Sequence, residues 1–156
     1  MRILCLPRTH FERLRGTPAE ARVLAENKVI SIQSRMGLDD EPPFSPEVLG
    51  SPNLLCLVFD DYCGIPDDPD ELAKIALFTP EMAEQIFRFV DAPRHPVLVH
   101  CTEGVSRSGA VGMVLNEYFN HQVADRPVDY RRFFVDNPRI MPNPNVLTIM
   151  REVAAR

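Results

Sequence analysis

Residues 97–115 read VLVHCTEGVSRSGAVGMVL, and this stretch combines three patterns that together indicate the fold. The segment VLVH is a short apolar run with β-branched residues, which is typical of a buried strand. The residues from Cys101 to Arg107 are mostly small or polar and include a glycine, which is typical of a tight loop. From Ser108 onward an apolar pattern returns with small residues that suit a closely packed helix. The stretch therefore predicts a strand, a loop and a helix in direct succession.

Strand and helix patterns also alternate on both sides of this stretch. Strands are expected over residues 2–6, 29–34 and 54–59, and helices over residues 18–28, 80–92, 108–121, 128–137 and 144–156. Thr79 before Pro80 supplies a capping hydroxyl and a favourable first residue for the helix that follows. This order predicts an α/β fold with a central, mostly parallel sheet of about four to five strands flanked by helices. In such sheets ligands bind where a strand ends and a helix begins, as at Cys101.

Composition bounds the classes of protein that this chain can represent. With 156 residues it fits a single domain spanning 1–156, large enough to bury a core without disulfides. A net charge of −5 argues against nucleic acid or an anionic membrane as the main partner. No apolar run approaches the roughly 20 residues of a membrane span, and charges in the first 14 residues argue against a signal peptide. The chain is therefore expected to be cytoplasmic.

The four cysteines show no C-x-x-C pair and no regular spacing. Neither a disulfide framework nor a zinc site is expected, and no metal or cofactor is predicted. Cys5 and Cys56 lie inside apolar runs, so we expect both in the core, with the strand over 54–59 buried on both faces.

The loop after residue 100 has the chemistry of an anion-binding nest. Between Cys101 and Arg107 lie five residues, which are Thr102, Glu103, Gly104, Val105 and Ser106. A loop of this length can wrap one tetrahedral anion with successive N–H groups, at the positive end of the next helix. These dipoles and a nearby guanidinium favour a thiolate over a thiol at Cys101. Arg107 presents a planar fork of donors for two phosphate oxygens, and Ser108 can donate to the thiolate.

The segment HCTEGVSRS, residues 100–108, resembles the His-Cys-x5-Arg-Ser/Thr signature of the cysteine-dependent protein tyrosine phosphatase superfamily, in its compact dual-specificity-like or bacterial form. The resemblance implies that Cys101 is the nucleophile of a phosphocysteine intermediate and that Arg107 binds phosphate. It further implies that Ser108 aids thiolate departure and that His100 orients the loop. The implied substrates are phosphorylated proteins or peptides carrying phosphotyrosine, with phosphoserine and phosphothreonine left open. Phosphate, sulfate or vanadate would bind as active-site anions.

A phosphatase of this kind needs a proton donor for the leaving group, and the family takes it from a loop after a neighbouring upstream strand. Here Asp61 in the segment VFDDY fits the family's hydrophobic-Asp-polar context best. The segment 62–79, apparently inserted, separates Asp61 from Cys101 and leaves other donors open. The alternative acids are Asp60, Asp67, Asp68 and Asp70.

Two further residues carry weaker predictions. The segment RIMPNPNV resembles a Pro-Asn segment before the family's last helix, so Asn143 is expected to support the active-site loops, with a helix cap as the alternative. Cys63 is either a redox partner of Cys101 or an ordinary free thiol.

Two other functions stay open on the sequence. One is a phosphoinositide or RNA-end phosphatase of the same fold, and the other is a phosphate-binding module without catalysis. The loop carries Glu103 and no lysine, which disfavours polyanionic substrates.

Overall fold

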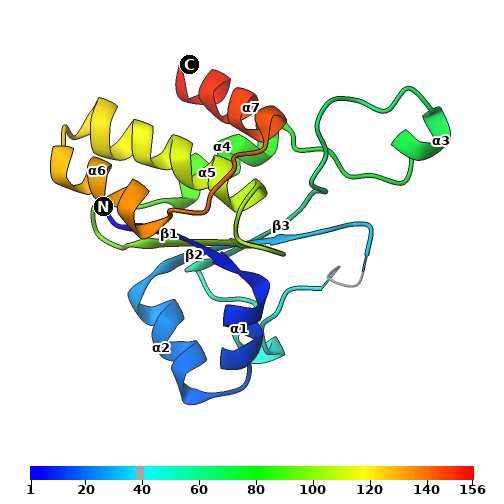
Figure 1. The fold of residues 1–156 in the computed structure, drawn as a ribbon. Helices are drawn as coiled ribbons and strands as arrows, with labels where there is room; N and C mark the ends of the chain where they lie inside the picture. The colour runs from blue at the N-terminus through cyan, green and yellow to red at the C-terminus, as the bar shows by residue number, and fades with distance from the viewer. Residues whose placement is uncertain (38–40) are drawn as a thin grey trace.

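The computed structural model describes residues 1–37 and 41–156, and its centre is a four-stranded sheet (Figure 1). The strands are β1 (Ile3–Pro7), β2 (Lys28–Gln33), β3 (Leu54–Val58) and β4 (Val97–Cys101). Their order is β1-β4-β2-β3, and all three pairings are parallel. The predicted α/β fold is confirmed, and the sheet has the lower of the two expected strand numbers.

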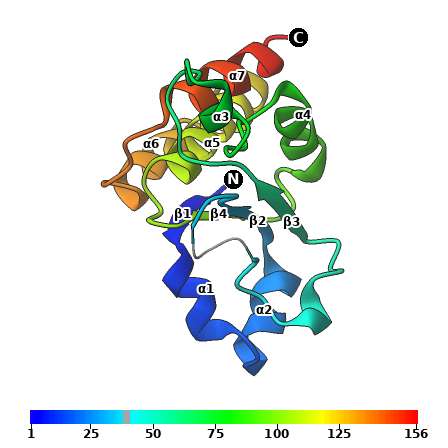
Figure 2. The same ribbon diagram turned by 90° about the vertical axis from the view of Figure 1, so that its right-hand side faces the viewer.

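Helices cover both faces of this sheet, which gives the molecule three layers (Figure 2). One face carries α1 (Arg8–Leu14) and α2 (Pro18–Glu26). The other face carries α4 (Pro80–Phe89), α5 (Arg107–Leu115), α6 (Pro127–Asp136) and α7 (Pro144–Ala154). The described residues form three further elements, which are η1 (Pro46–Val48), α3 (Pro69–Leu72) and the π-helical segment η2 (Asn116–Val123).

Alternation along β4 sends neighbouring side chains to opposite layers. Val99 and Cys101 belong to the large core beneath α4, α5 and α7. Leu98 joins the smaller core with Phe11 of α1, and the ring centroid of His100 lies 5.1 Å from that of Phe11. The strand thus places the thiol on the α5 side of the sheet and the imidazole on the α1 side.

The prediction that residues 54–59 are buried on both faces was wrong, because β3 is an edge strand. Leu54 lies in the smaller core, whereas Cys56 is exposed and Val58 is 42% exposed. The layer of α1 and α2 covers the start of β3 and leaves the rest of that face to solvent. The expected core position of Cys56 is therefore wrong as well, while Cys5 is half-buried against the large core.

Two helix predictions need adjustment. The helix α1 was missed because its sequence buries only Phe11 and so lacks an apolar period. The helix expected over 108–121 is divided between α5 and η2. In contrast, Thr79 caps α4 as expected, since its Oγ1 accepts a hydrogen bond from the N–H of Met82 at 3.2 Å.

Candidate active site

The loop between β4 and α5, residues 101–107, is held from outside by the surrounding chain. The carbonyls of Thr102, Val105 and Ser106 accept bonds from the backbone N–H groups of Arg8, Met141 and Asn143, at 3.2, 3.0 and 3.0 Å. Because the C=O and N–H of one peptide unit point in opposite directions, the next N–H groups along the chain face the inside of the loop. This arrangement is the one that an anion-binding nest requires. We call residues 101–107 the cysteine loop.

Gly104 is required by the path of the cysteine loop. Its φ is +74°, in the region that residues with a Cβ rarely adopt. A Cβ at this position would lie 2.5 Å from the carbonyl carbon of Leu6 and 2.6 Å from the nitrogen of Pro7. The loop can therefore pass this close to the end of β1 only because residue 104 is glycine.

Arg107 is 4% exposed, and its guanidinium is oriented by two strand ends. Its Nη1 donates to Oγ of Ser34 and to the carbonyl of Phe59, both at 2.9 Å, and Nη2 donates to Oγ1 of Thr102 at 2.9 Å. Its Nε is buried and has no hydrogen-bond partner among the described residues. Ser34 and Phe59 were missed by the sequence analysis. Each directly follows a strand, β2 or β3, so the meeting of parallel strand ends could have indicated them.

Cys101 is 2% exposed and lies at the base of the loop beside the first turn of α5. Its Sγ is 3.2 Å from Oγ of Ser108. A second thiol, Cys5 on β1, donates to the carbonyl of Ser108 at 3.3 Å. Burial, with a smaller contribution from Cys101, raises the pKa of Cys5 well above its usual range. The thiol of Cys5 therefore remains protonated at neutral pH.

His100 is fully buried beneath the cysteine loop. Its Nε2 lies 2.6 Å from Oγ of Ser31, which also accepts a hydrogen bond from Nε2 of Gln33. Its Nδ1 lies 3.3 Å from the carbonyl oxygen of Cys101. The imidazole thus links the backbone at Cys101 to β2. Ser31 and Gln33 are further residues that the sequence analysis missed.

Asp61 lies over the cysteine loop, although it comes from the chain after β3. Its Oδ1 accepts bonds from Oγ of Ser106 at 2.8 Å and from Nδ2 of Asn143 at 2.7 Å. Asp61, Cys101 and Arg107 line the same cavity, of about 330 Å³, together with Thr102, Glu103, Val105 and Ser106. Both donors bind Oδ1, so Oδ2 has no hydrogen-bond partner among the described residues.

The carboxylate of Asp60 is occupied elsewhere. It accepts bonds from the backbone N–H groups of Met36 at 3.1 Å and Ala76 at 2.7 Å, and it does not line the cavity of Cys101. These bonds connect the end of β3 to the loop after β2 and to the 62–79 insertion. The remaining candidate acids are exposed in that insertion and line no part of the cavity, and they are Asp67, Asp68 and Asp70.

Asn143 is both a helix cap and a support for the segment that carries Asp61, the two roles that the sequence offered as alternatives. Its Oδ1 caps α7 by accepting bonds from the N–H groups of Asn145 at 3.0 Å and Val146 at 3.2 Å. Its Nδ2 donates to Asp61 and to the carbonyl of Tyr62, at 2.7 and 3.2 Å. One buried amide therefore connects α7 to the segment that carries Asp61.

Cys63 is exposed and does not line the cavity of Cys101, so the structure does not bring these two thiols together. Glu103 is exposed at the rim of the cysteine loop. Across residues 1–37 and 41–156, no group of three or more His, Cys, Asp or Glu side chains could hold a metal ion. Within the same ranges, no helix has the length and apolar character needed to cross a bilayer.

The fold and the loop at its strand-to-helix junction define an α/β protein with a buried cysteine at the base of a loop between a parallel strand and a helix. The structure of PTPMT1 in complex with PI(5)P aligns with 99% of this chain and 90% of its own, at 17% identity and a TM-score of 0.54. Its TM-score shows that the two proteins share a fold. The resemblance seen in the sequence is thereby confirmed for the fold.

Two other solved structures are similar over most of their length. Tk-PTP in its active form covers 100% of this chain and 93% of its own, at 17% identity and a TM-score of 0.49. Human DUSP28 covers 98% and 91%, at 16% identity and a TM-score of 0.47. No family model and no curated protein matches the chain.

Proposed function

We propose that this protein is a cysteine-dependent phosphomonoester hydrolase that removes phosphate from phosphotyrosine in proteins, through a phosphocysteine intermediate. The observation that carries the proposal is the buried Nε of Arg107, which lacks a partner among the described residues, in a side chain that lines one cavity with Cys101 and Asp61. A phosphate oxygen would supply the acceptor that this N–H needs.

In the first step the thiolate of Cys101 attacks phosphorus, forming a P–S bond as the bond between phosphorus and the leaving oxygen breaks. Arg107 and the inward N–H groups of the cysteine loop stabilise the equatorial oxygens. Asp61 gives its proton from Oδ2 to the leaving oxygen, so that tyrosine departs as a neutral phenol.

In the second step water attacks the phosphocysteine, and Asp61 accepts a proton from that water. The P–S bond breaks and its electron pair returns to the sulfur of Cys101. Ser108, whose Oγ lies 3.2 Å from that sulfur, donates a hydrogen bond to the thiolate as it forms. Inorganic phosphate leaves, and the enzyme regains its starting charge. A reducing compartment, such as the cytoplasm, keeps the thiol available for this chemistry.

The charges around the cavity favour a phosphoprotein over a phosphoinositide or an RNA end. Apart from Arg107, the ionisable side chains that line it are those of the acidic residue Glu103 and of the proton donor Asp61, and neither is basic. A substrate with several phosphates would meet repulsion at this rim, whereas a single phosphate on a phenol places its charge on Arg107.

Cys101→Ser tests the proposal. Wild type should hydrolyse para-nitrophenyl phosphate and a phosphotyrosyl peptide, with competition by vanadate, and Cys101→Ser should lose turnover of both while still binding the peptide. Cys63→Ser, at an exposed thiol outside the cavity, is the control and should keep full activity. Full turnover by Cys101→Ser would refute the mechanism. No turnover by wild type would identify a binding module, and faster hydrolysis of an inositol lipid would reassign the substrate.

A further inference from the structure

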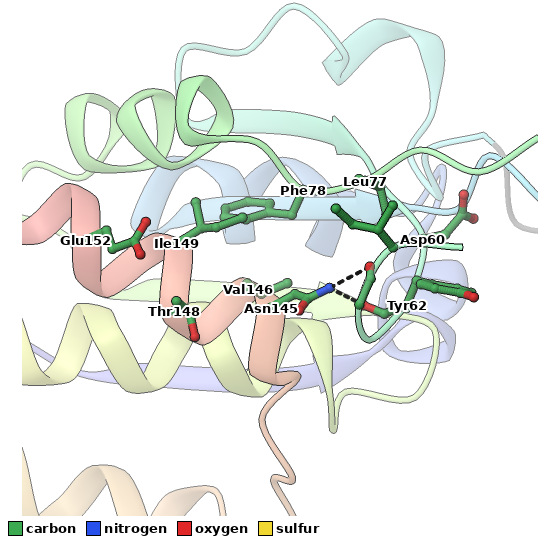
Figure 3. Close-up of a pocket in the computed structure, with 11 residues that line it drawn as sticks. Asp60, Tyr62, Leu77, Phe78, Asn145, Val146, Thr148, Ile149 and Glu152 are labelled. Atoms are coloured by element: carbon green, nitrogen blue, oxygen red, sulfur yellow. Dashed lines mark hydrogen bonds between the residues drawn. The ribbon is translucent and has the colours of Figure 1, made fainter. Parts of the chain in front are cut away.

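A second cavity, of about 450 Å³, lies between the chain after β3 and α7, and Figure 3 shows the residues that line it. Asp60 and Tyr62 line it, whereas Asp61 between them lines the catalytic cavity, so the two share the segment 60–62 as a wall. Much of its lining is apolar, formed by Ile65 and Leu77–Phe78 of the insertion region and by Val146 and Ile149 of α7. We call it the insertion cavity.

A lining residue of the insertion cavity is hydrogen-bonded to the chain segment that follows the candidate acid, Asp61. Nδ2 of Asn145 on α7 donates to the carbonyls of Tyr62 at 3.3 Å and Gly64 at 3.0 Å, and Figure 3 shows this side chain reaching across to the segment after β3. These residues directly follow Asp61. A ligand in the insertion cavity would thus contact the same segment that presents the acid to the catalytic cavity.

The charge around the insertion cavity is negative. Glu152 of α7 lines it and has no ion-pair partner within the described ranges. The two arginines of the C-terminal region are used elsewhere, since Arg151 pairs with Glu117 at 2.6 Å and Arg156 pairs with Glu84 at 3.0 Å. The exposed acids of the insertion, a few residues beyond Ile65, are Asp67, Asp68, Asp70 and Glu71.

Lys74 is the one basic residue within residues 62–79, which carry these four acidic residues. In Figure 1 the segment around α3 projects from the body of the molecule. Ile65 is 72% exposed at the cavity, so its apolar surface is available to a partner. An apolar hollow that has the unpaired Glu152 in its lining complements an apolar side chain flanked by basic residues, and the acidic insertion nearby in the sequence repels an anionic membrane.

We propose that the insertion cavity is a docking site for a segment of the protein substrate, in which an apolar side chain is flanked by lysine or arginine. This inference rests on the proposed function and deepens it, because it names the class of phosphoprotein that the enzyme selects. The apolar side chain enters among Ile65, Phe78 and Ile149, and the basic residues face Glu152 and the insertion. Docking next to the catalytic cavity raises the local concentration of the phosphorylated residue.

Phosphotyrosyl peptides that share one core test this proposal. In the first peptide, a Gly-Ser spacer joins the core to a docking segment, a leucine flanked by lysine and arginine, and versions with the segment before and after the core are both made. The second peptide has glutamate in place of the basic residues. The third has serine in place of the leucine. We expect kcat/KM for the first to exceed that for the others by about tenfold, through KM, which corresponds to about 1.4 kcal/mol. The advantage should shrink between about 0.05 M and about 0.5 M NaCl, because salt screens the charges.

The variants Ile65→Ser and Glu152→Lys should each remove this preference and leave turnover of para-nitrophenyl phosphate unchanged, since neither residue lines the catalytic cavity. Matched controls are Val135→Ser, at a 77% exposed valine of α6, and Glu47→Lys, at an exposed glutamate of η1. Neither control residue lines the insertion cavity, and both variants should keep the preference.

Equal kcat/KM for all peptides, or a preference that persists in Ile65→Ser and Glu152→Lys, would overturn the docking site. Self-association that Ile65→Ser abolishes would assign the cavity to a second copy and would also overturn it. Fluorescence anisotropy of a labelled, unphosphorylated peptide that carries the leucine and its basic neighbours measures binding to the insertion cavity without turnover. If wild type lacks all phosphatase activity, the proposed function fails, while anisotropy still decides whether the segment binds.

Discussion

The side-chain amide of Asn143 donates to Oδ1 of Asp61 at 2.7 Å, which joins residues 82 positions apart. Ser106, inside the cysteine loop, donates to the same oxygen at 2.8 Å. The carboxylate of Asp61 is thus held by the start of α7 on one side and by the loop around Cys101 on the other. Its orientation depends on three segments that only the fold brings together.

Asn143→Asp separates this contact from helix capping. An aspartate still accepts the N–H bonds at the start of α7, but it cannot donate to Asp61 and repels it. We expect kcat for a phenyl phosphate to fall by about tenfold, and the buried charge facing Asp61 and the carbonyl of Tyr62 to lower the unfolding free energy by about 1–3 kcal/mol. Asn143→Ala should lose the same contact without adding a charge, and it should also lose about 1 kcal/mol of unfolding free energy because the cap is lost. Steady-state kinetics and thermal unfolding measure the two effects, and normal kcat in Asn143→Asp would contradict the positioning role.

Asp61→Asn and Asp60→Asn should have opposite profiles. Removing the acid at Asp61 should lower kcat for poor leaving groups by about 10²–10⁴-fold and affect good leaving groups much less, with little change in stability. Asp60→Asn should lose about 1–3 kcal/mol of stability, because its amide cannot accept both backbone N–H bonds. If Asp60→Asn were instead the variant with the large loss of kcat for poor leaving groups, the acid would be Asp60.

Ser108→Ala should slow the second step more than the first. Without the hydroxyl 3.2 Å from the sulfur of Cys101, the thiolate is a poorer leaving group. We expect steady-state kcat to fall by about tenfold, the contribution of one charge-assisted hydrogen bond. Rapid-quench experiments should then show a burst of product and a phosphocysteine adduct detectable by mass spectrometry. A fall in rate without any burst would place the effect of Ser108 on the first step.

Gly104→Ala should disrupt the cysteine loop. The added Cβ meets the backbone of Leu6 and Pro7 at 2.5 and 2.6 Å at a positive φ, so the loop must move. We expect a loss of about 1–3 kcal/mol of stability and loss of vanadate inhibition together with activity. Gly50→Ala is the matched control, because a Cβ there meets nothing within 4 Å. Retained vanadate affinity in Gly104→Ala would show that the loop tolerates the side chain.

Cys5 should resist alkylation although it lies close to the nucleophile. Its pKa is raised first by burial and then by Cys101, so at neutral pH it stays a thiol, and thiols react slowly. Peptide mapping after iodoacetamide treatment should find Cys101 and the exposed Cys63 modified and Cys5 unmodified. In guanidinium chloride Cys5 should react as well. Modification of Cys5 in the native protein at the rate of Cys63 would contradict this assignment.

Much of the fold could be predicted from local patterns. The alternation of strand and helix segments gave the parallel sheet, and Thr79 with Pro80 marked the start of α4 correctly. Edge position could not be predicted for β3, because an apolar run looks the same whether one face or both are covered. The helix α1 was missed for a related reason, since burying only Phe11 gives no periodic signal.

Of the residues around Cys101, some could be predicted from the sequence and others could not. Those within residues 100–108 were identifiable as candidates because a short loop constrains residue type at each position. The contacts of Arg107 with Ser34 and Phe59 were not, since a serine and a backbone carbonyl carry no sequence signature.

The sequence by itself determined the cysteine loop and its place between a strand and a helix, because glycine at residue 104 and the spacing from Cys101 to Arg107 act over a few bonds. Only the tertiary structure decided which carboxylate lies over the loop, since Asp60 and Asp61 are adjacent and chemically alike. Successive side chains leave an extended chain in different directions. Hydrogen bonds to the chain after β3 hold Asp60 on the backbone N–H groups of Met36 and Ala76, and they hold Asp61 on Asn143 and Ser106.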